Sequence, residues 1–265
     1  WRSLNTRPTP QWFKDAKFGI FIHWGLYSVP AWGPKGSYAE WYLNGLNTGD
    51  TARLRYHEQN YGKDFLYRDF INLFNPINYD SDRWAELFKN AGAKYVVLTS
   101  KHHDGFCLWP NQQSKGYNSF DGIAGRDLLG ELNKSVKEIG VRSGFYYSLY
   151  EWDHPDYPDN LPKYVNNYMI PQLKDAVQRY SPDIIFSDGE WDRSSYEWKS
   201  EKFLAWLYNE SNAPEDVVVN DVLLVPHGVV ATECQRIPSF LSLQRVLRLP
   251  VLLLPGTVPA AVHQV

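Results

Sequence analysis

The chain has few of the features that mark disulfide scaffolds, membrane proteins or nucleic-acid-binding domains. Only two of its 265 residues are cysteines, Cys107 and Cys234, so no disulfide framework is expected to hold the fold. No run of about 18 apolar residues is present, so the sequence predicts no membrane span. The 27 basic side chains against 30 acidic ones give a formal net charge of −3, which argues against a nucleic-acid-binding surface. The residues from Trp1 do not resemble a signal peptide.

Aromatic residues, in contrast, are abundant, and many of them follow apolar runs that resemble buried parallel strands. The chain contains 11 Trp and 18 Tyr. Four such runs lie at residues 18–22, 95–99, 141–145 and 183–186. Each is followed by a cluster of aromatic and ionisable residues: His23-Trp24-Gly25, Lys101-His102-His103-Asp104-Gly105, Tyr146-Tyr147-Ser148 with Glu151-Trp152, and Asp188-Gly189-Glu190-Trp191. Barrels and doubly wound sheets build active sites at the carboxyl ends of parallel strands, so these clusters predict one pocket. Tryptophans beside ionisable groups favour a pocket that stacks flat sugar faces over simple core packing.

The order of the predicted elements indicates parallel βα units. We expect strands at residues 18–23, 94–99, 141–148, 183–187 and 217–220, and helices at 11–17, 81–91, 127–139, 169–180 and 199–208. Ser81 is the predicted N-cap of the second helix. The stretch from Ser28 to Phe74 is predicted to be a long functional loop with short helical pieces. Alternating strands and helices predict an α/β protein.

The composition changes after Asp221. Residues 222–265 contain one acidic residue, Glu233, and one aromatic residue, Phe240, although the preceding segments are rich in both. The Leu/Val runs of this tail have no interpretable period. We interpret the tail as a foreign, mis-spliced or wrongly assigned end rather than as a β-rich linker.

Asp188 is the strongest candidate for a catalytic group. It directly follows an apolar run, where a carboxylate can act as a nucleophile, a general base or a metal ligand. An Asp-Gly pair that only starts a turn is the alternative. Glu190 alternates with Asp188 and is expected on the same side.

The pair His102-His103, followed by Asp104, has two interpretations. These residue types bind zinc or iron, but adjacent histidines on an extended segment point to opposite sides and chelate one ion poorly. Neutral histidines that form hydrogen bonds with a polyol are the better interpretation. His23 ends the first strand and is expected to face a ligand, although a lone histidine is more often a core residue. Tyr146 and Tyr147 should point to opposite faces, so only one enters the pocket.

Two Asn-x-Ser/Thr patterns begin at Asn133 and Asn209 and are candidate glycosylation sites. Because such short patterns often arise by chance, they support a secretory route only weakly.

Three phrases together resemble the α-L-fucosidases, the retaining glycosidases of glycoside hydrolase family twenty-nine. They are Phe18-Gly-Ile-Phe-Ile-His-Trp-Gly-Leu-Tyr-Ser-Val-Pro-Ala-Trp32, Gly92-Ala-Lys-Tyr-Val-Val-Leu-Thr-Ser-Lys-His-His-Asp-Gly-Phe106 and Phe186-Ser-Asp-Gly-Glu-Trp191. The resemblance covers residues 7–221 in collinear order and is greatest to the animal lysosomal or secreted members.

The resemblance implies a catalytic (β/α) barrel of the TIM type, followed by a β-sandwich. It assigns the nucleophile to Asp188 and fucose binding to His23, Glu40, Trp41, His102, His103 and Tyr146. It implies no metal or organic cofactor. The implied partner is a fucosylated glycan, with terminal α-L-fucose on a glycoprotein, glycolipid or oligosaccharide, and the implied location is the lysosome or the extracellular space. A homo-oligomer is left open.

The sequence departs from the family pattern where the second catalytic carboxyl is approached. Family members continue the Asn-Asp of the fifth strand with Arg-Trp-Gly, whereas Val222-Leu223-Leu224 follows Asp221 here. We therefore expect residues 1–221 to be the N-terminal part of a barrel that is incomplete on its C-terminal side, and residues 222–265 to be an unmatched tail. A chain without a recognisable acid/base is expected to be nearly inactive, because that group contributes roughly 10²–10⁴-fold. A non-catalytic fucose-binding protein and a metal-dependent hydrolase using His102, His103 and Asp104 are the alternatives.

Overall fold

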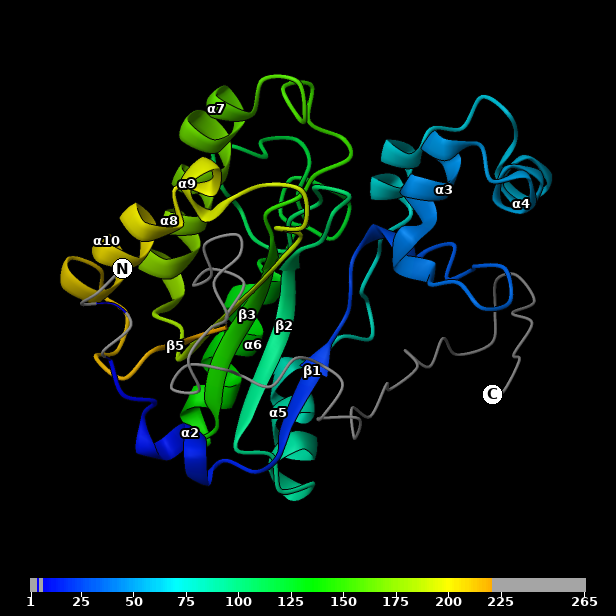
Figure 1. Ribbon diagram of the computed structural model, residues 1–265. Coiled ribbons are helices and arrows are strands. Elements are labelled where there is room, and N and C mark those ends of the chain that lie inside the picture. Colours follow the sequence, from blue (N-terminus) through cyan, green and yellow to red (C-terminus); the bar gives the residue numbers. More distant parts are fainter. Residues whose placement is uncertain (1–3, 5–6, 221–265) are drawn as a thin grey trace.

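The fold is a five-stranded parallel sheet in which the strands lie side by side in chain order (Figure 1). The computed structural model describes residue 4 and residues 7–220, so Asp221 and the predicted tail at 222–265 lie outside the described residues. The strands are β1 (Gly19–Ile22), β2 (Tyr95–Lys101), β3 (Arg142–Ser148), β4 (Ile184–Asp188) and β5 (Val218–Val219). All four neighbouring pairs are parallel. Sequential parallel neighbours are the arrangement of a βα barrel, and the sheet is not closed within the described residues.

All five predicted strands are present, and the carboxyl ends of all but β3 differ from the prediction by one or two residues. β2 continues through Ser100 to Lys101, because Lys101 still pairs with Tyr147 of β3 after a register shift. β4 includes Asp188, which pairs with Ser148. β1 ends at Ile22, one residue before His23.

Helices follow the strands and carry the predicted apolar faces. They are α2 (Gln11–Asp15), α5 (Ser81–Asn90), α6 (Leu128–Glu138), α7 (Leu161–Tyr164), the π-helix η4 (Val165–Met169), α8 (Ile170–Tyr180), α9 (Ser195–Trp198) and α10 (Ser200–Asn209). The predicted N-cap of α5 was wrong. Asp80 caps this helix by accepting a 3.0 Å hydrogen bond from the Arg83 amide, while the Ser81 hydroxyl meets Ser135 Oγ at 2.9 Å.

The long segment after β1 is more helical than the sequence indicates. It contains η1 (Leu26–Ser28), η2 (Ala39–Trp41), α3 (Tyr42–Thr48), α4 (Thr51–Tyr61) and η3 (Tyr67–Asn72). Asp50 starts α4 by accepting hydrogen bonds from the amides of Ala52 and Arg53. Figure 1 shows α3 and α4 together beyond the carboxyl end of β1. Glu40 and Trp41 lie in η2, at the start of this unit.

The sheet separates two apolar layers because side chains alternate along each strand. One layer packs with the helices and includes Val96, Leu98, Phe145, Tyr147 and Ile185. The other contains Val97, Tyr146, Ile184 and Val218, with Phe21 and Phe186 packed against them. This second layer is on the face that would line the inside of a closed barrel. Asp188 lies beyond it, at the carboxyl end of β4.

A polar cluster holds the amino ends of the strands. Arg142 at the start of β3 donates to Asp183 at 2.7 Å and to Asp216 at 3.0 Å. The guanidinium also lies over the Trp12 ring, 4.5 Å from its centroid. This cluster fixes β3, the segments before β4 and β5, and helix α2 to one another, at the end of the sheet opposite Asp188.

Candidate active site

The carboxyl ends of β1 to β4 bring most of the predicted site residues together. The ring of His102 lies 5.7 Å from that of His23, 4.2 Å from that of His103 and 5.5 Å from that of Tyr146, centroid to centroid. Trp41 reaches the same cluster, since its ring is 5.8 Å from that of His103. These residues come from four separate segments of the sequence. The structure therefore brings these predicted residues together in one cluster at the strand ends.

Glu40 lies at the edge of this cluster. It is half-buried and close enough to Tyr27 for its charge to help raise the pKa of that phenol, after the larger effect of burial and that of Asp104. The Tyr27 ring in turn contacts His102 at 5.3 Å. Glu40 is thus linked to the cluster through the effect of its charge on Tyr27.

Asp188 is held by the neighbouring strand. The Tyr146 hydroxyl donates a 2.8 Å hydrogen bond to Asp188 Oδ2, and the Gly189 amide meets Oδ1 at 2.8 Å. Tyr147 points to the opposite face, where its hydroxyl donates to Gln172 Oε1 at 2.7 Å. The prediction that these two tyrosines point to opposite faces is confirmed. Asp188 itself remains partly open to solvent, as a reacting carboxylate must be.

The hydrogen bonds around His103 define which ring nitrogen carries the proton. The Ser148 hydroxyl donates its only hydrogen to the Tyr150 carbonyl at 2.6 Å, so His103 Nδ1, 2.6 Å from Ser148 Oγ, must be the donor in that contact. Burial, together with the charges of Lys101 and His23, lowers the pKa of His103 to about 3. The ring is therefore neutral. Its Nε2 is a bare acceptor 3.9 Å from Asp188 Oδ2.

The prediction that His102 and His103 point to opposite sides was wrong. Both follow the last residue of β2 and lie in a turn, in which the Gly105 amide donates to the His102 carbonyl at 3.1 Å. Strand alternation does not hold there, and the two rings pack edge to face. Burial, with the neighbouring charges of His103, His23 and Lys101, lowers the pKa of His102 well below its usual value. Its buried Nδ1 has no hydrogen-bond partner among the described residues.

The Asp104 carboxyl forms its hydrogen bonds with groups other than the two histidines. It accepts from the Tyr67 hydroxyl at 2.6 Å and from the Phe106 amide at 3.3 Å. Burial raises its pKa to about 7. Within residue 4 and residues 7–220, no group of three or more His, Cys, Asp or Glu side chains is arranged to hold a metal ion.

A fully buried ion pair lies directly behind the histidine turn. Lys101 Nζ is 2.6 Å from Glu151 Oε2, and the two side chains are 0% and 3% exposed. Tyr168 donates to Glu151 Oε1 at 3.2 Å. The residue after Glu151, Trp152, donates its amide to the His103 carbonyl at 2.7 Å. The pair therefore ties the turn after β2 to the loop after β3.

Sequence reasoning missed two inward-facing aromatic residues. The Phe21 ring lies 5.1 Å from that of Phe186 and 5.9 Å from that of Tyr146. Both phenylalanines alternate with residues of the helix-packed layer, so strand periodicity could have placed them beside Tyr146. Trp24 is instead a core residue, packed on Phe74, Tyr79 and Trp84.

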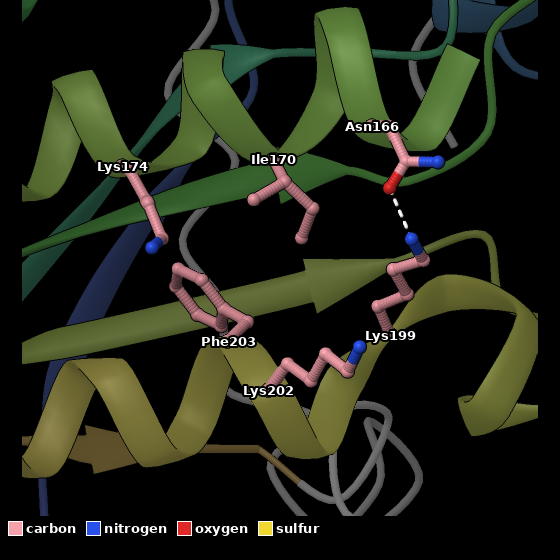
Figure 2. Close-up of a pocket in the computed structure, with 6 residues that line it drawn as sticks. All are labelled: Asn166, Ile170, Lys174, Lys199, Lys202 and Phe203. Carbon is pink, nitrogen blue, oxygen red and sulfur yellow. Dashed lines mark hydrogen bonds between the residues drawn. The ribbon is translucent and has the colours of Figure 1, made fainter. Parts of the chain in front are cut away.

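A separate pocket lies on the outer helices. It has a volume of about 290 Å³ and is lined by Asn166, Ile170, Lys174, Lys199, Lys202 and Phe203. Figure 2 shows its side chains projecting from the facing helices, with Lys199 donating to Asn166. The pocket is not part of the cluster at the strand ends. In the described part of the chain, no helix is both long and apolar enough to cross a bilayer.

Comparisons with known proteins agree on one family. The family described as "Alpha-L-fucosidase" matches residues 1–233. A tissue alpha-L-fucosidase of Rattus norvegicus is 47% identical over 227 residues, which cover 83% of this chain and 48% of the relative. An alpha-L-fucosidase of Dictyostelium discoideum is 45% identical over 232 residues, covering 83% of this chain and 50% of the relative. The chain thus spans about half the length of the curated relatives it matches.

The solved structures give the same result. The crystal structure of Thermotoga maritima alpha-fucosidase in complex with fucose superposes with a TM-score of 0.75 at 40% identity. The match covers 86% of this chain and 57% of the Thermotoga chain. An alpha-L-fucosidase of Bacteroides thetaiotaomicron matches with a TM-score of 0.67 at 31% identity, covering 82% and 48%.

Proposed function

The chain belongs to the α-L-fucosidase family of glycosidases, and from this we propose that it releases terminal α-L-fucose with retention of configuration, using Asp188 as the nucleophile. The substrates proposed are fucosylated glycoproteins, glycolipids and oligosaccharides. The observation that carries the proposal is the position of Asp188 at the end of β4, hydrogen-bonded to Tyr146 and 3.9 Å from the bare Nε2 of His103.

The surroundings of Asp188 suit nucleophilic attack. One Asp188 oxygen attacks the anomeric carbon, the bond to the leaving-group oxygen breaks, and a covalent fucosyl-enzyme forms. Water then attacks the same carbon, the bond between that carbon and Asp188 breaks, the carboxylate is regenerated, and the proton of the water passes to solvent. The bonds from Tyr146 and Gly189 hold the carboxylate in one orientation, which lowers the entropic part of the barrier.

The remaining site residues supply complementary contacts for the sugar. His103 Nε2 can accept a hydrogen bond from a hydroxyl that lies between it and Asp188. His23, His102 and Glu40 provide further polar contacts, and Trp41 packs on an apolar ring face. Phe21 and Phe186 form an aromatic wall beside Tyr146, where the methyl group of a 6-deoxy sugar would be desolvated.

Retaining hydrolysis also needs a second carboxyl that protonates the leaving group, about 5–5.5 Å from the nucleophile. Asp104 and Glu151 are engaged with Tyr67 and Lys101, and we assign this role to no residue of the described part of the chain. We therefore propose that the chain reacts faster with donors whose leaving group needs no protonation than with natural glycosides. A purely fucose-binding protein would not form the covalent intermediate.

The test compares α-L-fucosyl fluoride with an alkyl α-L-fucoside. We expect fluoride release and a fucosyl adduct on Asp188 in the intact mass, with much slower turnover of the alkyl fucoside. Asp188→Ala should abolish both reactions, and added azide should restore reaction of the fluoride through direct attack on the sugar. Asp64→Ala, a change at an exposed aspartate, is the matched control. Full activity of Asp188→Ala would rule out the assigned nucleophile.

We further propose that the protein follows the secretory route to the lysosome or the extracellular space. The support is the similarity to animal tissue fucosidases and an accessible sequon at Asn209, the exposed last residue of α10. The second sequon is less accessible. Asn133 lies inside α6, and the Ser135 hydroxyl of the same sequon is buried against Asp82 at 2.6 Å.

A further inference from the structure

A second aromatic surface packs around His103. We call it the rim platform and define it as Tyr150, Trp152 and Trp191. Their rings lie 6.0, 5.0 and 5.2 Å from that of His103, centroid to centroid. Trp41 borders the platform, with its ring 5.1 Å from Trp152 and 6.0 Å from Trp191.

Backbone contacts between three loops hold the platform in place. The Leu149 amide donates to the Asp188 carbonyl at 2.8 Å, and the Trp152 amide donates to the His103 carbonyl at 2.7 Å. Gly189 has a φ of +83°, and a Cβ at this position would lie 2.5 Å from Tyr150 Cβ. Glycine thus lets the chain turn sharply after the nucleophile and lie against Tyr150. That turn brings Trp191 back over His103.

Trp191 differs from the next tryptophan in the chain, Trp198. It is 42% exposed, whereas Trp198 is 1% exposed and donates its indole N–H to the Glu190 carbonyl. The Trp191 ring is also nearly parallel to that of Trp41, at 25°. A large aromatic face left open beside a reacting carboxylate is suited to bind an apolar surface of a ligand.

The distances place this face next to the bond that would break. Asp188 Oδ2 is 3.9 Å from His103 Nε2, and the His103 ring is 5.2 Å from that of Trp191. Of the fucose contacts proposed above, His23 and Tyr146 pack on His102, whereas the platform packs on His103. Trp41 lies between the two groups and borders both. A sugar on the far side of the scissile bond would therefore lie over the platform.

We propose that the rim platform, with Trp191 as its main contact, binds the pyranose to which fucose is linked. This inference rests on the proposed function and adds the chemical class of the neighbouring unit. The unit is a neutral hexopyranose that places an apolar C–H face on the indole. No charged side chain belongs to the platform, so recognition here depends on stacking rather than on ion pairing.

The test measures equilibrium binding by titration calorimetry in an Asp188→Asn background, which stops turnover. The probes are methyl α-L-fucoside, which lacks the second ring, and α-L-fucosyl-(1→2)-D-galactose. We expect the disaccharide to bind about tenfold more tightly than the methyl glycoside, a difference of ~1.4 kcal/mol. Trp191→Ala should remove this preference while changing the affinity for the methyl glycoside less than about twofold. Trp191→Phe should keep part of it.

Tyr196→Ala is the matched control, because Tyr196 is an exposed aromatic residue of α9 that is not part of the platform. It should leave both affinities unchanged, and near-UV circular dichroism checks that each variant is folded. If the two probes bind with equal affinity to the protein that keeps Trp191, the inference is overturned and the proposed function remains intact. Equal weakening of both probes by Trp191→Ala would place Trp191 in the fucose site and also overturn it. If neither probe binds, the proposed function fails together with the inference.

Discussion

The Tyr146 hydroxyl donates a 2.8 Å hydrogen bond to Asp188 Oδ2, so the carboxylate at the end of β4 takes its orientation from β3. Tyr146 pairs in register with Phe186, two residues before Asp188, and the long phenol side chain spans that offset. Burial and the charge of Asp188 raise the pKa of this tyrosine, which keeps the phenol protonated as a donor. The orientation of this proposed nucleophile thus depends on the pairing of two strands as well as on the Gly189 amide.

Replacing Tyr146 by phenylalanine removes this donor while keeping the ring. Hydrogen bonds to charged groups contribute about 1.5–3 kcal/mol, so we expect turnover of α-L-fucosyl fluoride to fall by roughly 10- to 150-fold. Tyr147→Phe is the matched control. It removes the bond to Gln172 on the other face and should affect stability rather than rate. Similar rate losses in both variants would contradict a specific role for Tyr146.

Ser148 is predicted to be a positioning residue for His103. Ser148→Ala removes the group that accepts the hydrogen bond from His103 Nδ1–H. The ring proton is then no longer held on Nδ1, and Nε2 is no longer fixed as the unprotonated nitrogen. We expect the affinity for methyl α-L-fucoside to fall by about tenfold, and nitrogen-15 NMR of His103 to change from one tautomer to a mixture. Ser187→Ala, which loses a bond to Asn220 instead, should leave the tautomer unchanged. An unchanged His103 spectrum in Ser148→Ala would refute this role.

Asp104 should make the stability of the protein depend on pH. Its folded pKa of about 7 is above the unfolded value, so the folded state holds the proton more tightly between about pH 4 and 7. The stabilisation from this group is complete at low pH and is lost as the pH rises through 7. We expect the free energy of unfolding of wild type relative to Asp104→Asn to fall by roughly 4 kcal/mol between pH 4 and 8. Urea titrations at several pH values measure this, and a constant difference would contradict it.

The buried pair Lys101–Glu151 should show strong coupling. Lys101→Met leaves a buried carboxylate without its partner, and we expect a loss of about 3–5 kcal/mol in the free energy of unfolding. The double variant Lys101→Met with Glu151→Gln should recover part of this loss. The exposed pair Lys134–Glu138, at 3.8 Å, is the control and should couple by no more than about 0.5 kcal/mol. Equal coupling in the two pairs, from double-mutant cycles in urea, would argue against this role.

The sequon at Asn209 is predicted to be glycosylated in preference to that at Asn133. Asn209 is the exposed last residue of α10. The Ser135 hydroxyl of the other sequon is instead buried and donates a hydrogen bond to Asp82. Expression in a eukaryotic secretory host followed by glycopeptide mass spectrometry measures occupancy at both. Higher occupancy at Asn133 would contradict the prediction.

The strands and their functional ends could be predicted from the sequence because both depend on local pattern. Buried parallel strands appear as apolar, β-branched runs, and Asp188 is the last residue of the strand that such a run forms. The placement of Tyr146 and Tyr147 on opposite faces also follows from strand periodicity alone.

What could not be predicted depends on where a strand stops and on pairs far apart in sequence. His102 and His103 lie just after the end of β2, so the alternation assumed for them did not apply. Lys101 and Glu151 are separated by 50 residues, and nothing local shows that their charges meet. The N-cap of α5 was displaced by one residue because Asp80 and Ser81 both suit the position.

The Arg142 cluster bears on how this protein can diversify. It fastens the amino ends of β3, β4 and β5, far from every side chain proposed to touch a sugar. Related proteins can therefore differ in the loops beyond the strands, and in glycan preference, while they keep the same contacts at the amino ends of the strands. Laboratory libraries that randomise residues 150, 152, 153 and 190–194, and leave Arg142, Glu151, Asp183 and Asp216 untouched, should retain a high fraction of folded members.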